Sequence, residues 1–446
     1  MKKLYIILIL AMTGIMAEAQ TSVWNGSRKL LTRGEGTESN PYRIETAENL
    51  AFLAYMVNKG FDTRGMFFEL TTDIDLNGSE YQPWTPIGTG NNYFYEDGCY
   101  RKPETFYAPS NLFRGCFDGG GHKIYNIYIK DATYGGLFGG TDEPCEIRNV
   151  IVESGYIQNV VYGGGIVGKC NNNNTIVANC SNKVDINGDY VGGIMGHGTG
   201  IISQCFNSGN IKGNNASGGI AGMMAKEITE CFNTGKVTAH SGGCGGIIGS
   251  TQREVTIENC YNRGRVSGSA QNTGGIGGFV VKGTVKNCYN VGDIANNEGM
   301  AGGIIGANYN GTADNIYYLN TCSSEGIGTA MSDVDMREEA FVDILNKDTN
   351  VWGYDNSNVN DGYPLLESFH LSTAETICTT MSVYPNPAKG SFTVEGTGLM
   401  TVMNVLGQKV MQRTIEECST VTLPEGMYLL RLTNGNASTT RKVVVY

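Results

Sequence analysis

The sequence predicts an all-β protein built around a parallel β-helix, and three observations support this. A five-residue pattern, Gly-Gly-Ile/Leu-x-Gly, recurs seven times at intervals of 26–29 residues. Glycine supplies 63 of the 446 residues, which is about twice its usual share of ~7%. Between residues 135 and 320 the apolar residues show no helical period, and turn residues recur at short intervals.

Each repeat of about 28 residues contains three short β runs, which fits one coil of a β-helix. A propeller blade needs ~40 residues and a leucine-rich repeat needs an L-x-x-L-x-L core, so both fit less well. The third residue of the motif is always Leu or Ile, whereas the fourth varies. Strand alternation therefore predicts that only the third residue faces the core. The motif begins at Gly135, Gly164, Gly192, Gly218, Gly245, Gly274 and Gly302.

The first 19 residues have the features of a secretory signal peptide. Lys2 and Lys3 form a positive end, an apolar stretch follows from residue 4 to residue 16, and Ala17-Glu18-Ala19 fits a cleavage site. About 13 apolar residues are too few to span the ~30 Å of a bilayer core. No later apolar run is long enough to span a membrane, so we expect export and no transmembrane segment after cleavage.

Two helices are expected, one on each side of the repeats. Residues 46–58 are amphipathic, with Leu50, Leu53 and Val57 on one face and Thr46 as the N-cap. Such a helix would cover the open core of the first coil and protect its strand edges. Residues 336–348 form the second predicted helix.

A second block follows five of the Gly motifs and places a cysteine in one slot of successive coils. Because Val150 and Ile316 fill the same slot in the flanking coils, we expect the slot to face the core, with free thiols acting as small apolar side chains. Disulfides and a metal site are the alternatives. In-register side chains point in parallel, which disfavours disulfides, and no C-x2-C pair supports zinc. The five residues are Cys180, Cys205, Cys231, Cys260 and Cys288.

The two slots after each cysteine hold an aromatic residue and an asparagine. Stacked asparagines at a coil corner are predicted to bond to one another and to the turn backbone; they are Asn182, Asn207, Asn233, Asn262 and Asn290. Alternation then turns the aromatic slot outward, where a row of rings could bind a glycan or another ligand. The alternative is a stack that only covers the corner. The candidate ligand-binding residues are Phe206, Phe232, Tyr261 and Tyr289.

No catalytic, metal or cofactor site is predicted. The Gly motif has neither the spacing of a dinucleotide-binding loop nor a helix after it. Asp73-x-Asp75-x-Asn77-Gly78 begins like a calcium-binding loop, but Trp84 stands where the bidentate acid belongs. The histidines, at positions 122, 197, 240 and 370, occur in unrelated contexts. A net charge of −11 without a basic cluster argues against a nucleic-acid partner.

The repeats resemble the GLUG-motif repeat of bacterial surface proteins. The resemblance covers about residues 34–366 and includes the segments FELTTDIDLNG, WTPIG, FRGCFDGGGHKI and DGYPLL besides the Gly motifs. It implies a right-handed, pectate-lyase-like β-helix on the cell surface. GLUG repeats carry no agreed catalytic residues, so the resemblance implies no particular chemistry.

The C-terminal segment resembles the type A sorting domain of the type IX secretion system. The matching stretches are VYPNPAKGSFTV, NVLGQKV, LPEGMYLLRL and KVVVY. The resemblance implies a small β-sandwich that the export machinery recognises, in a bacterium of the Bacteroidota type. Its alternating β runs separated by Pro and Gly turns also fit a small sandwich.

The predicted domains are therefore a signal peptide (1–19), a β-helix (20–377) and a sorting domain (378–446). We expect a non-enzymatic protein, secreted or on the outer-membrane surface, that acts as an adhesin or binds a glycan or host surface ligand. Its other expected partner is the type IX machinery, through residues 378–446. A polysaccharide lyase or glycoside hydrolase is the first alternative, and a structural spacer is the second.

Overall fold

The structure is a computed structural model. It describes residues 21–89, 94–96, 99–101, 111–269, 272–296, 300–323, 326–369, 382–395, 398–404, 409–415, 418–434 and 437–446. Contacts divide the chain into two units, residues 1–336 and 337–446. The predicted signal peptide and the predicted domain boundary between residues 377 and 378 lie outside the described residues.

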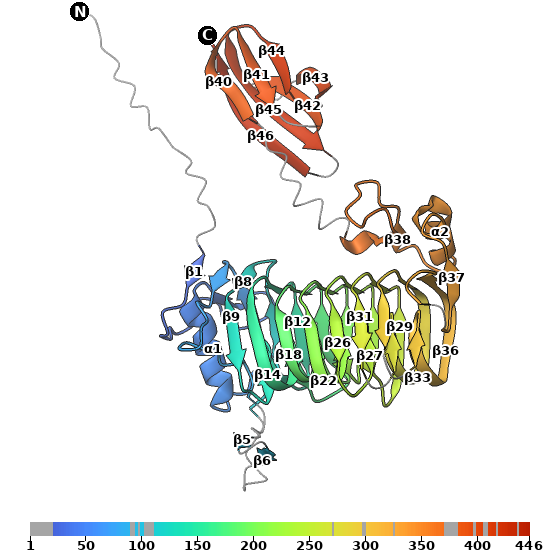
Figure 1. The fold of residues 1–446 in the computed structure, drawn as a ribbon. Coiled ribbons are helices and arrows are strands. Elements are labelled where there is room, and N and C mark those ends of the chain that lie inside the picture. The colour runs from blue at the N-terminus through green and yellow to red at the C-terminus, as the bar shows by residue number, and fades with distance from the viewer. Residues whose placement is uncertain are drawn as a thin grey trace, which may run out of the picture. The chain divides into compact units, whose positions relative to one another are not determined.

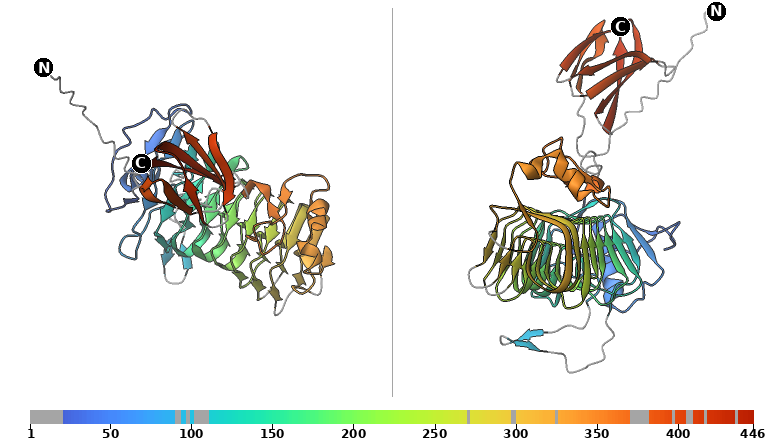
Figure 2. Two further views of the ribbon diagram at one scale, coloured as in Figure 1. Left: turned by 90° about the horizontal axis from the view of Figure 1, so that it is seen from above. Right: turned by 90° about the vertical axis from the view of Figure 1, so that its right-hand side faces the viewer.

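The first unit is a β-solenoid of about nine turns, as the repeat predicted (Figure 1). Strands of successive coils pair in parallel and lie side by side along the solenoid in both further views (Figure 2). Each coil contributes strands in the same order, so equivalent strands of successive coils stack into four rows. Three rows belong to a 24-stranded sheet and the fourth is an 11-stranded sheet, here called the groove sheet.

In the first row of the larger sheet, each strand begins at or beside the fourth residue of a Gly motif. It comprises β11 (Phe138–Thr141), β15 (Val167–Cys170), β19 (Met195–Gly198), β23 (Ala221–Met223), β28 (Ile248–Ser250), β33 (Gly277–Asn290) and β36 (Ile305–Leu319). β33 and β36 are long enough to continue into the next two rows.

The second row begins near the N-terminus. It comprises β2 (Tyr42–Ile44), β3 (Phe67–Leu70), β7 (Cys116–Asp118), β12 (Cys145–Arg148), β16 (Thr175–Ala178), β20 (Ile201–Ser203), β24 (Glu227–Thr229) and β29 (Glu254–Glu258). The third row carries the aromatic and asparagine slots. It comprises β1 (Ser22–Val23), β4 (Ile74–Asp75), β8 (Lys123–Tyr125), β13 (Ile151–Val152), β17 (Ser181–Asn182), β21 (Phe206–Asn207), β25 (Phe232–Asn233) and β30 (Tyr261–Asn262), and β37 (Thr329–Met331) pairs with the end of β36.

The groove sheet completes each coil before the next Gly motif. It comprises β9 (Ile127–Lys130), β10 (Tyr134–Gly135), β14 (Gly155–Gly164), β18 (Asp185–Gly192), β22 (Ile211–Gly218), β26 (Val237–Ala239), β27 (Cys244–Gly245), β31 (Val266–Gly268), β32 (Thr273–Gly274), β34 (Ile294–Asn296) and β35 (Ala301–Gly302). A separate antiparallel pair joins β5 (Phe94–Glu96) to β6 (Cys99–Arg101).

The Gly motif forms a corner, which corrects one sequence prediction. Ile247 and Ile248, the third and fourth residues of one copy, are both fully buried, although alternation predicted that only Ile247 would face inward. A bend separates strand β27 from β28 at this point, so the period of two is interrupted and both side chains enter the core.

The N-terminal helix α1 (Ala47–Asn58) begins where the sequence predicts. Thr46 is its N-cap, and the Thr46 hydroxyl accepts a hydrogen bond from the backbone N–H of Asn49. Leu50, Leu53 and Val57 are fully buried and belong to the same apolar core as the coils. Helix α1 lies at the N-terminal end of the solenoid (Figure 1).

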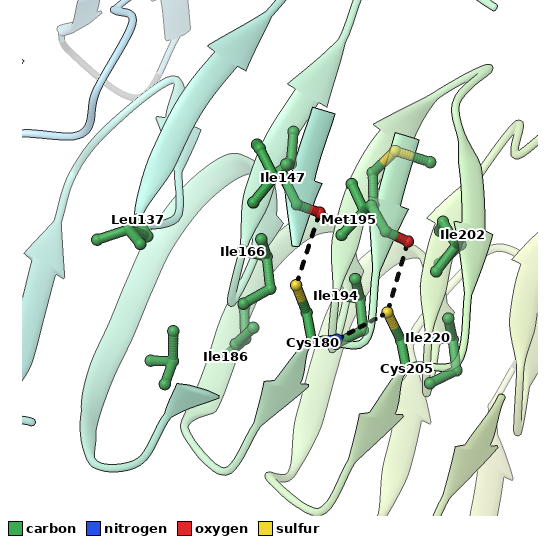
Figure 3. Packing of buried hydrophobic residues seen from close by; sticks show 14 of the residues in the cluster. Leu137, Ile147, Ile166, Cys180, Ile186, Ile194, Met195, Ile202, Cys205 and Ile220 are labelled. Carbon is green, nitrogen blue, oxygen red and sulfur yellow. Dashed lines mark hydrogen bonds between the residues drawn. The ribbon is translucent and has the colours of Figure 1, made fainter. Parts of the chain in front are cut away.

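The cysteine slot faces the core, as predicted. All five residues of the slot are buried, and Figure 3 shows Cys180 and Cys205 among isoleucines of the same cluster. The Cys180 thiol donates to the carbonyl of Ile147 at 3.8 Å, and the backbone N–H of Cys180 donates to the sulfur of Cys205 at 3.4 Å. None of the cysteines described is in a disulfide. The side chains of Cys99 and Cys378 lie outside the described part.

The asparagine slot forms a buried ladder of amides, which confirms the structural interpretation. Asn233 Nδ2 donates to Asn262 Oδ1, and Asn262 Nδ2 donates to Asn290 Oδ1, each at 2.8 Å. Asn262 Nδ2 also donates to the carbonyl of Gly264 at 2.8 Å, two residues further along the turn. Each amide therefore satisfies both its neighbours and its own turn inside the core.

The residue before each cysteine adopts a left-handed backbone conformation. Asn179, Asn259 and Asn287 have φ of 50°, 53° and 51°. Asparagine tolerates this region better than other side chains, but Gln204 and Glu230 occupy the same slot with φ of 51° and 50°. The conformation turns the chain between the second and third rows in every coil where it occurs.

The second unit contains a short helical segment and an all-β part. Helix α2 (Glu339–Leu345) follows a 3-10 turn at Asp335–Arg337, so it is shorter than the predicted 336–348 helix. β38 (Trp352–Gly353) pairs with β39 (Leu365–Leu366). The C-terminal strands pair almost wholly antiparallel around one apolar core. They are β40 (Ser382–Lys389), β41 (Ser391–Glu395), β42 (Gly398–Asn404), β43 (Lys409–Ile415), β44 (Cys418–Thr422), β45 (Gly426–Asn434) and β46 (Ala437–Val445).

Candidate functional site

The predicted aromatic row is a continuous ring stack. Phe206 stacks on Phe232 with ring centroids 5.1 Å apart, Phe232 on Tyr261 at 4.8 Å, and Tyr261 on Tyr289 at 5.1 Å, all within 4° of parallel. The expected exposure of the whole row is not observed: Tyr261 is 4% exposed and Tyr289 is fully buried. Only Phe206 and Phe232 stay half-exposed, so the row packs mainly as a stack that covers a corner.

The carboxylates of the calcium-like segment are bonded to protein donors. Asp73 Oδ1 lies 3.1 Å from His122 Nδ1 and accepts the backbone N–H of Lys123. Asp75 Oδ1 accepts from Asn126 Nδ2 at 2.9 Å. Within the described ranges, no three His, Cys, Asp or Glu side chains come together as a metal site requires.

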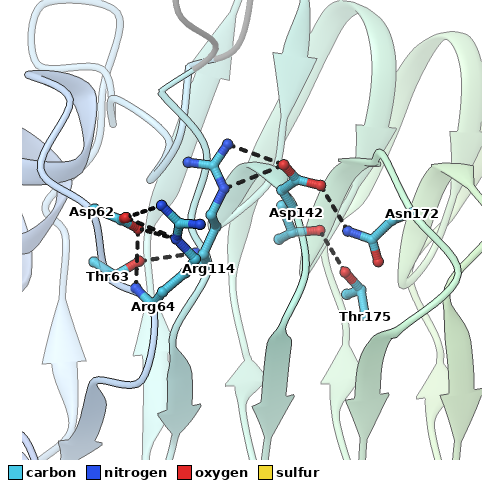
Figure 4. A network of polar contacts seen from close by, with 8 residues as sticks. Asp62, Thr63, Arg64, Arg114, Asp142, Asn172 and Thr175 are labelled. Carbon is cyan, nitrogen blue, oxygen red and sulfur yellow. Dashed lines mark hydrogen bonds and ion pairs between the residues drawn. The ribbon is translucent and has the colours of Figure 1, made fainter.

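A half-buried ion pair and its neighbours connect three early coils (Figure 4). Arg114 donates to Asp142 at 3.0 Å, and Asn172 donates to the other oxygen of the same carboxylate at 2.9 Å. Burial opposes the charge on Asp142, but the hydrogen bonds from Asn172 and Arg114 outweigh it and keep the Asp142 pKa below its ordinary value. Every oxygen of this carboxylate is engaged, so the network is structural.

Two hollows lie side by side on the groove sheet and share Asn214; together they are called the polar groove. The first has a volume of about 220 Å³ and the second about 380 Å³. Their walls carry amides, hydroxyls and carboxylates from successive coils: Asp131, Thr133, Asn159, Asn187, Asp189, Asn214, Thr238, His240, Ser267 and Ser269. Asn214 Nδ2 donates to Asp189 at 2.9 Å, and Asn159 Nδ2 donates to Asp131 at 3.0 Å.

β-Bulges shape this groove. The pairing of β14 with β18 shifts register between Ile157 and Val160, and the pairing of β18 with β22 shifts between Gly188 and Tyr190. An extra residue at these points bends the strand and leaves it locally unpaired. The sequence does not mark these positions, because the shift follows from slightly unequal coil lengths.

A second cluster, the Lys–His–Tyr cluster, was not predicted. It contains Lys169, His197 and a ladder of three tyrosines, Tyr134, Tyr162 and Tyr190. Lys169 and His197 are register partners on β15 and β19. Each tyrosine follows directly a residue that lines the polar groove, namely Thr133, Val161 and Asp189. Their spacing of one coil was visible in the sequence, but not the corner that gathers the cluster.

Burial changes the acid–base properties of this cluster. Desolvation, and then the charge of Lys169, lowers the pKa of His197 to about 4. Desolvation also lowers the pKa of Lys169 below its ordinary value. His197 is therefore neutral near pH 7, beside a half-buried ammonium group.

The C-terminal strands match a known protein family. Residues 382–446 match the family described as the secretion system C-terminal sorting domain. Residues 382–446 are a sorting domain. This domain is handled by the type IX secretion machinery, and it indicates secretion and attachment at the outer-membrane surface. In the part of the chain that the structure describes, no helix has the length and apolar character needed to cross a membrane.

The chain is similar to segments of much larger proteins. It is 31% identical over 175 residues to a protein of Evansella cellulosilytica whose name describes it as Gly-rich and of the membrane, covering 38% of this chain and 16% of that protein. It is 27% identical over 169 residues to Halomucin of Haloquadratum walsbyi, covering 37% of this chain and 2% of that protein. The chain thus spans less than a fifth of each relative. No solved structure matches the chain.

Proposed function

We propose that the protein is a non-enzymatic, secreted surface protein whose solenoid binds a glycan in the polar groove. The observation that carries this proposal is the groove itself, which crosses successive coils and has walls of amides and hydroxyls. Sugars are recognised by such donors and acceptors, because each hydroxyl both donates and accepts a hydrogen bond. Export by the sorting domain brings the groove to the outer surface, where glycans occur.

Binding of purified full-length protein to a panel of neutral and acidic oligosaccharides, measured by titration calorimetry, tests this proposal. Asn187 lines the first hollow, so Asn187→Ala removes groove donors directly, and Asn214→Ala removes the wall that both hollows share. A hydrogen bond contributes about 1 kcal/mol to the binding free energy, so the loss of one is expected to weaken binding about fivefold. Asn310→Ala, on an exposed part of β36, is the matched control and leaves binding unchanged.

Three results contradict the proposal. Turnover of any polysaccharide, detected as unsaturated or reducing-end product, would make the protein an enzyme instead. Equal binding by Asn187→Ala, Asn214→Ala and Asn310→Ala would move the site away from the groove. In that case the half-exposed end of the aromatic stack is the next candidate, and Phe206→Ala with Phe232→Ala tests it. Absence of any ligand favours a spacer.

We also infer the finer classification of the solenoid from its sequence. The GLUG-type motifs support a right-handed β-helix with coils of about 28 residues, and Tyr261 indeed pairs with Tyr289 in the following coil. The buried face of α1 supports its role as the N-terminal cap. A crystal structure of the secreted protein would test the handedness and the cap directly.

A further inference from the structure

The Lys–His–Tyr cluster brings a cation, a neutral imidazole and aromatic faces together. Lys169 Nζ lies 5.1 Å from the ring centroid of Tyr162 and 5.6 Å from that of Tyr134. The ring of His197 lies 4.9 Å from Tyr162 and 6.1 Å from Tyr190. Because Lys169 and His197 are register partners on parallel strands, their backbones are about 4.8 Å apart. Both side chains therefore flank the Tyr162 ring.

Lys169 is a half-buried cation with no carboxylate partner among the described residues. Three other lysines of the coils are paired with carboxylates: Lys123 and Lys183 each lie within 4.0 Å of Glu153, and Lys282 bonds to Glu254. Within the described part of the chain, the faces of Tyr134 and Tyr162 are the groups that lie against the Lys169 charge, and a cation–π contact offsets the cost of desolvation only in part. In a chain of net charge −11, a half-buried ammonium group without a neighbouring carboxylate is suited to pair with an anion from a ligand.

His197 supplies a second donor of defined direction. Its Nδ1 is buried and has no hydrogen-bond partner. Leaving a lone pair unpaired there costs less than burying an unpaired N–H, so the neutral ring carries its proton on Nε2. Nε2–H is then available to an acceptor outside the protein.

We propose that the Lys–His–Tyr cluster binds the anionic group of an acidic saccharide, a carboxylate or a sulfate ester. The ammonium group of Lys169 pairs with the anion and Nε2–H of His197 donates to it. The sugar ring packs on Tyr190, the last ring of the tyrosine ladder, which stacks on Tyr162 on one side and has the small Ala216 as its register partner in the next coil. The inference rests on the proposed function, because each tyrosine directly follows a residue that lines the polar groove. It adds a charge preference that the groove alone does not imply.

Paired probes that differ only in charge separate this inference from the proposed function. Oligogalacturonate is compared with its methyl ester, and dextran sulfate oligosaccharide with dextran. The full-length protein is expected to bind at least one charged probe about tenfold more tightly than its neutral partner. The pair that responds distinguishes a carboxylate from a sulfate ligand.

Variants of Lys169 then locate the preference. Lys169→Met keeps the apolar stem but removes the charge, and it is expected to abolish the preference for the charged probe without changing binding of the neutral one. Lys169→Arg keeps the preference within about threefold, since a guanidinium also pairs with anions. Lys226→Met, at an exposed lysine, is the control for net charge and leaves the preference intact. Circular dichroism shows whether each variant is folded.

Each outcome has a definite reading. Equal binding of charged and neutral probes overturns the inference and leaves the proposed function standing. A charge preference that survives in folded Lys169→Met also overturns it. A preference lost in Lys169→Met, together with binding of the charged and neutral probes that Asn187→Ala and Asn214→Ala leave unchanged, supports the cluster and overturns the groove. Failure to bind any of the four probes overturns the inference.

Discussion

Gly246 lies directly against the side-chain amide of Asn262. A Cβ atom on Gly246 would stand 2.3 Å from Asn262 Cγ and 2.1 Å from the carbonyl oxygen of Gly275 in the next coil. The same 2.3 Å approach to Cγ joins Gly193 to Asn207 and Gly219 to Asn233. The asparagine of the later block therefore requires a glycine at the second position of the motif, because its amide occupies the space that a Cβ would need.

Gly246→Ala should consequently destabilise the solenoid. Neither the amide ladder nor the backbone of the next coil can retreat, so we expect a loss of about 3 kcal/mol in the free energy of unfolding. Gly277→Ala is the matched control within another copy of the motif. A Cβ there meets side chains and no backbone, namely Val280 at 2.8 Å and Ile248 at 3.8 Å, in a slot that other copies fill with Phe, Met or Ile. Urea denaturation measures both, and equal stabilities would refute the explanation.

Asn262→Ala should cost about 3 kcal/mol, because it leaves several buried groups unpaired. Asn233 Nδ2, Asn290 Oδ1 and the Gly264 carbonyl each lose a hydrogen bond of 2.8 Å. Asn262→Asp should be no better, since a carboxylate cannot donate to Asn290. Asn310→Ala, on the surface, should stay within about 0.5 kcal/mol of the wild type. A ladder variant as stable as this control would show that the amide chain contributes little.

The sequence predicted the repeated fold well because each slot recurs in every coil. The inward Cys260 and Asn262 and the capped helix at Thr46 all follow from periodicity and local chemistry. Alternation failed at Ile248, because a corner interrupts the strand and turns two successive side chains inward. It overestimated the exposure of Tyr289 for a related reason: alternation states which side of a strand a residue occupies, and not what covers that side.

The Lys–His–Tyr cluster was beyond sequence reasoning for a different reason. Lys169 and His197 occupy a slot that Met223 and Ser250 fill in later coils, so the repeat pattern does not distinguish them. Tyr162 lies on the other side of the Gly corner from Lys169. Only the folded corner brings the ring to 5.1 Å from the ammonium group.

Glu230→Asn should stabilise the protein. Glu230 has φ of 50°, a left-handed conformation that costs about 1 kcal/mol for most side chains and less for asparagine. We expect a gain of about 0.5 kcal/mol, reduced by the loss of the 3.2 Å contact with Gln204. The reverse change, Asn259→Glu at φ 53°, should destabilise by a similar amount or more. Thermal unfolding of both variants checks the prediction, and shifts of the same sign would contradict it.

The ladder thiols should be free but unreactive in the native protein. All five side chains are buried, so a reagent cannot reach them in the folded protein. Burial also raises the pKa of the Cys180 and Cys288 thiols, whereas for Cys205 and Cys260 burial is outweighed by hydrogen bonds from neighbouring thiols, which lower the pKa. An alkylating reagent should therefore modify exposed Cys418 first, and all five ladder residues only after unfolding without reductant. Peptide mass spectrometry identifies the modified sites. Ladder cysteines that resist alkylation in the unfolded, unreduced protein would instead be disulfide-bonded.

Acidification should destabilise the solenoid through His197. Burial, followed by the charge of Lys169, holds its pKa at about 4, against an ordinary value of 6.5. The unfolded state therefore binds a proton more readily between these values, so stability is complete above about pH 6.5 and falls as the pH drops toward 4. The loss approaches about 3 kcal/mol at most, from a shift of two to three pKa units.

His197→Phe removes this titration while it keeps a ring beside Tyr162 and Tyr190. The side chains that face His197 are Met223, its register partner on the other side, the two tyrosines and Lys169. Asp118 and Asp142 have pKa values below 3.8, so their contribution to acid unfolding begins at lower pH. Unfolding free energies measured from pH 7.5 to pH 4.5 should thus decline more in the wild type than in His197→Phe. Parallel curves would mean that His197 is as readily protonated in the folded protein as in the unfolded one, and the neutral donor assigned to it would be lost.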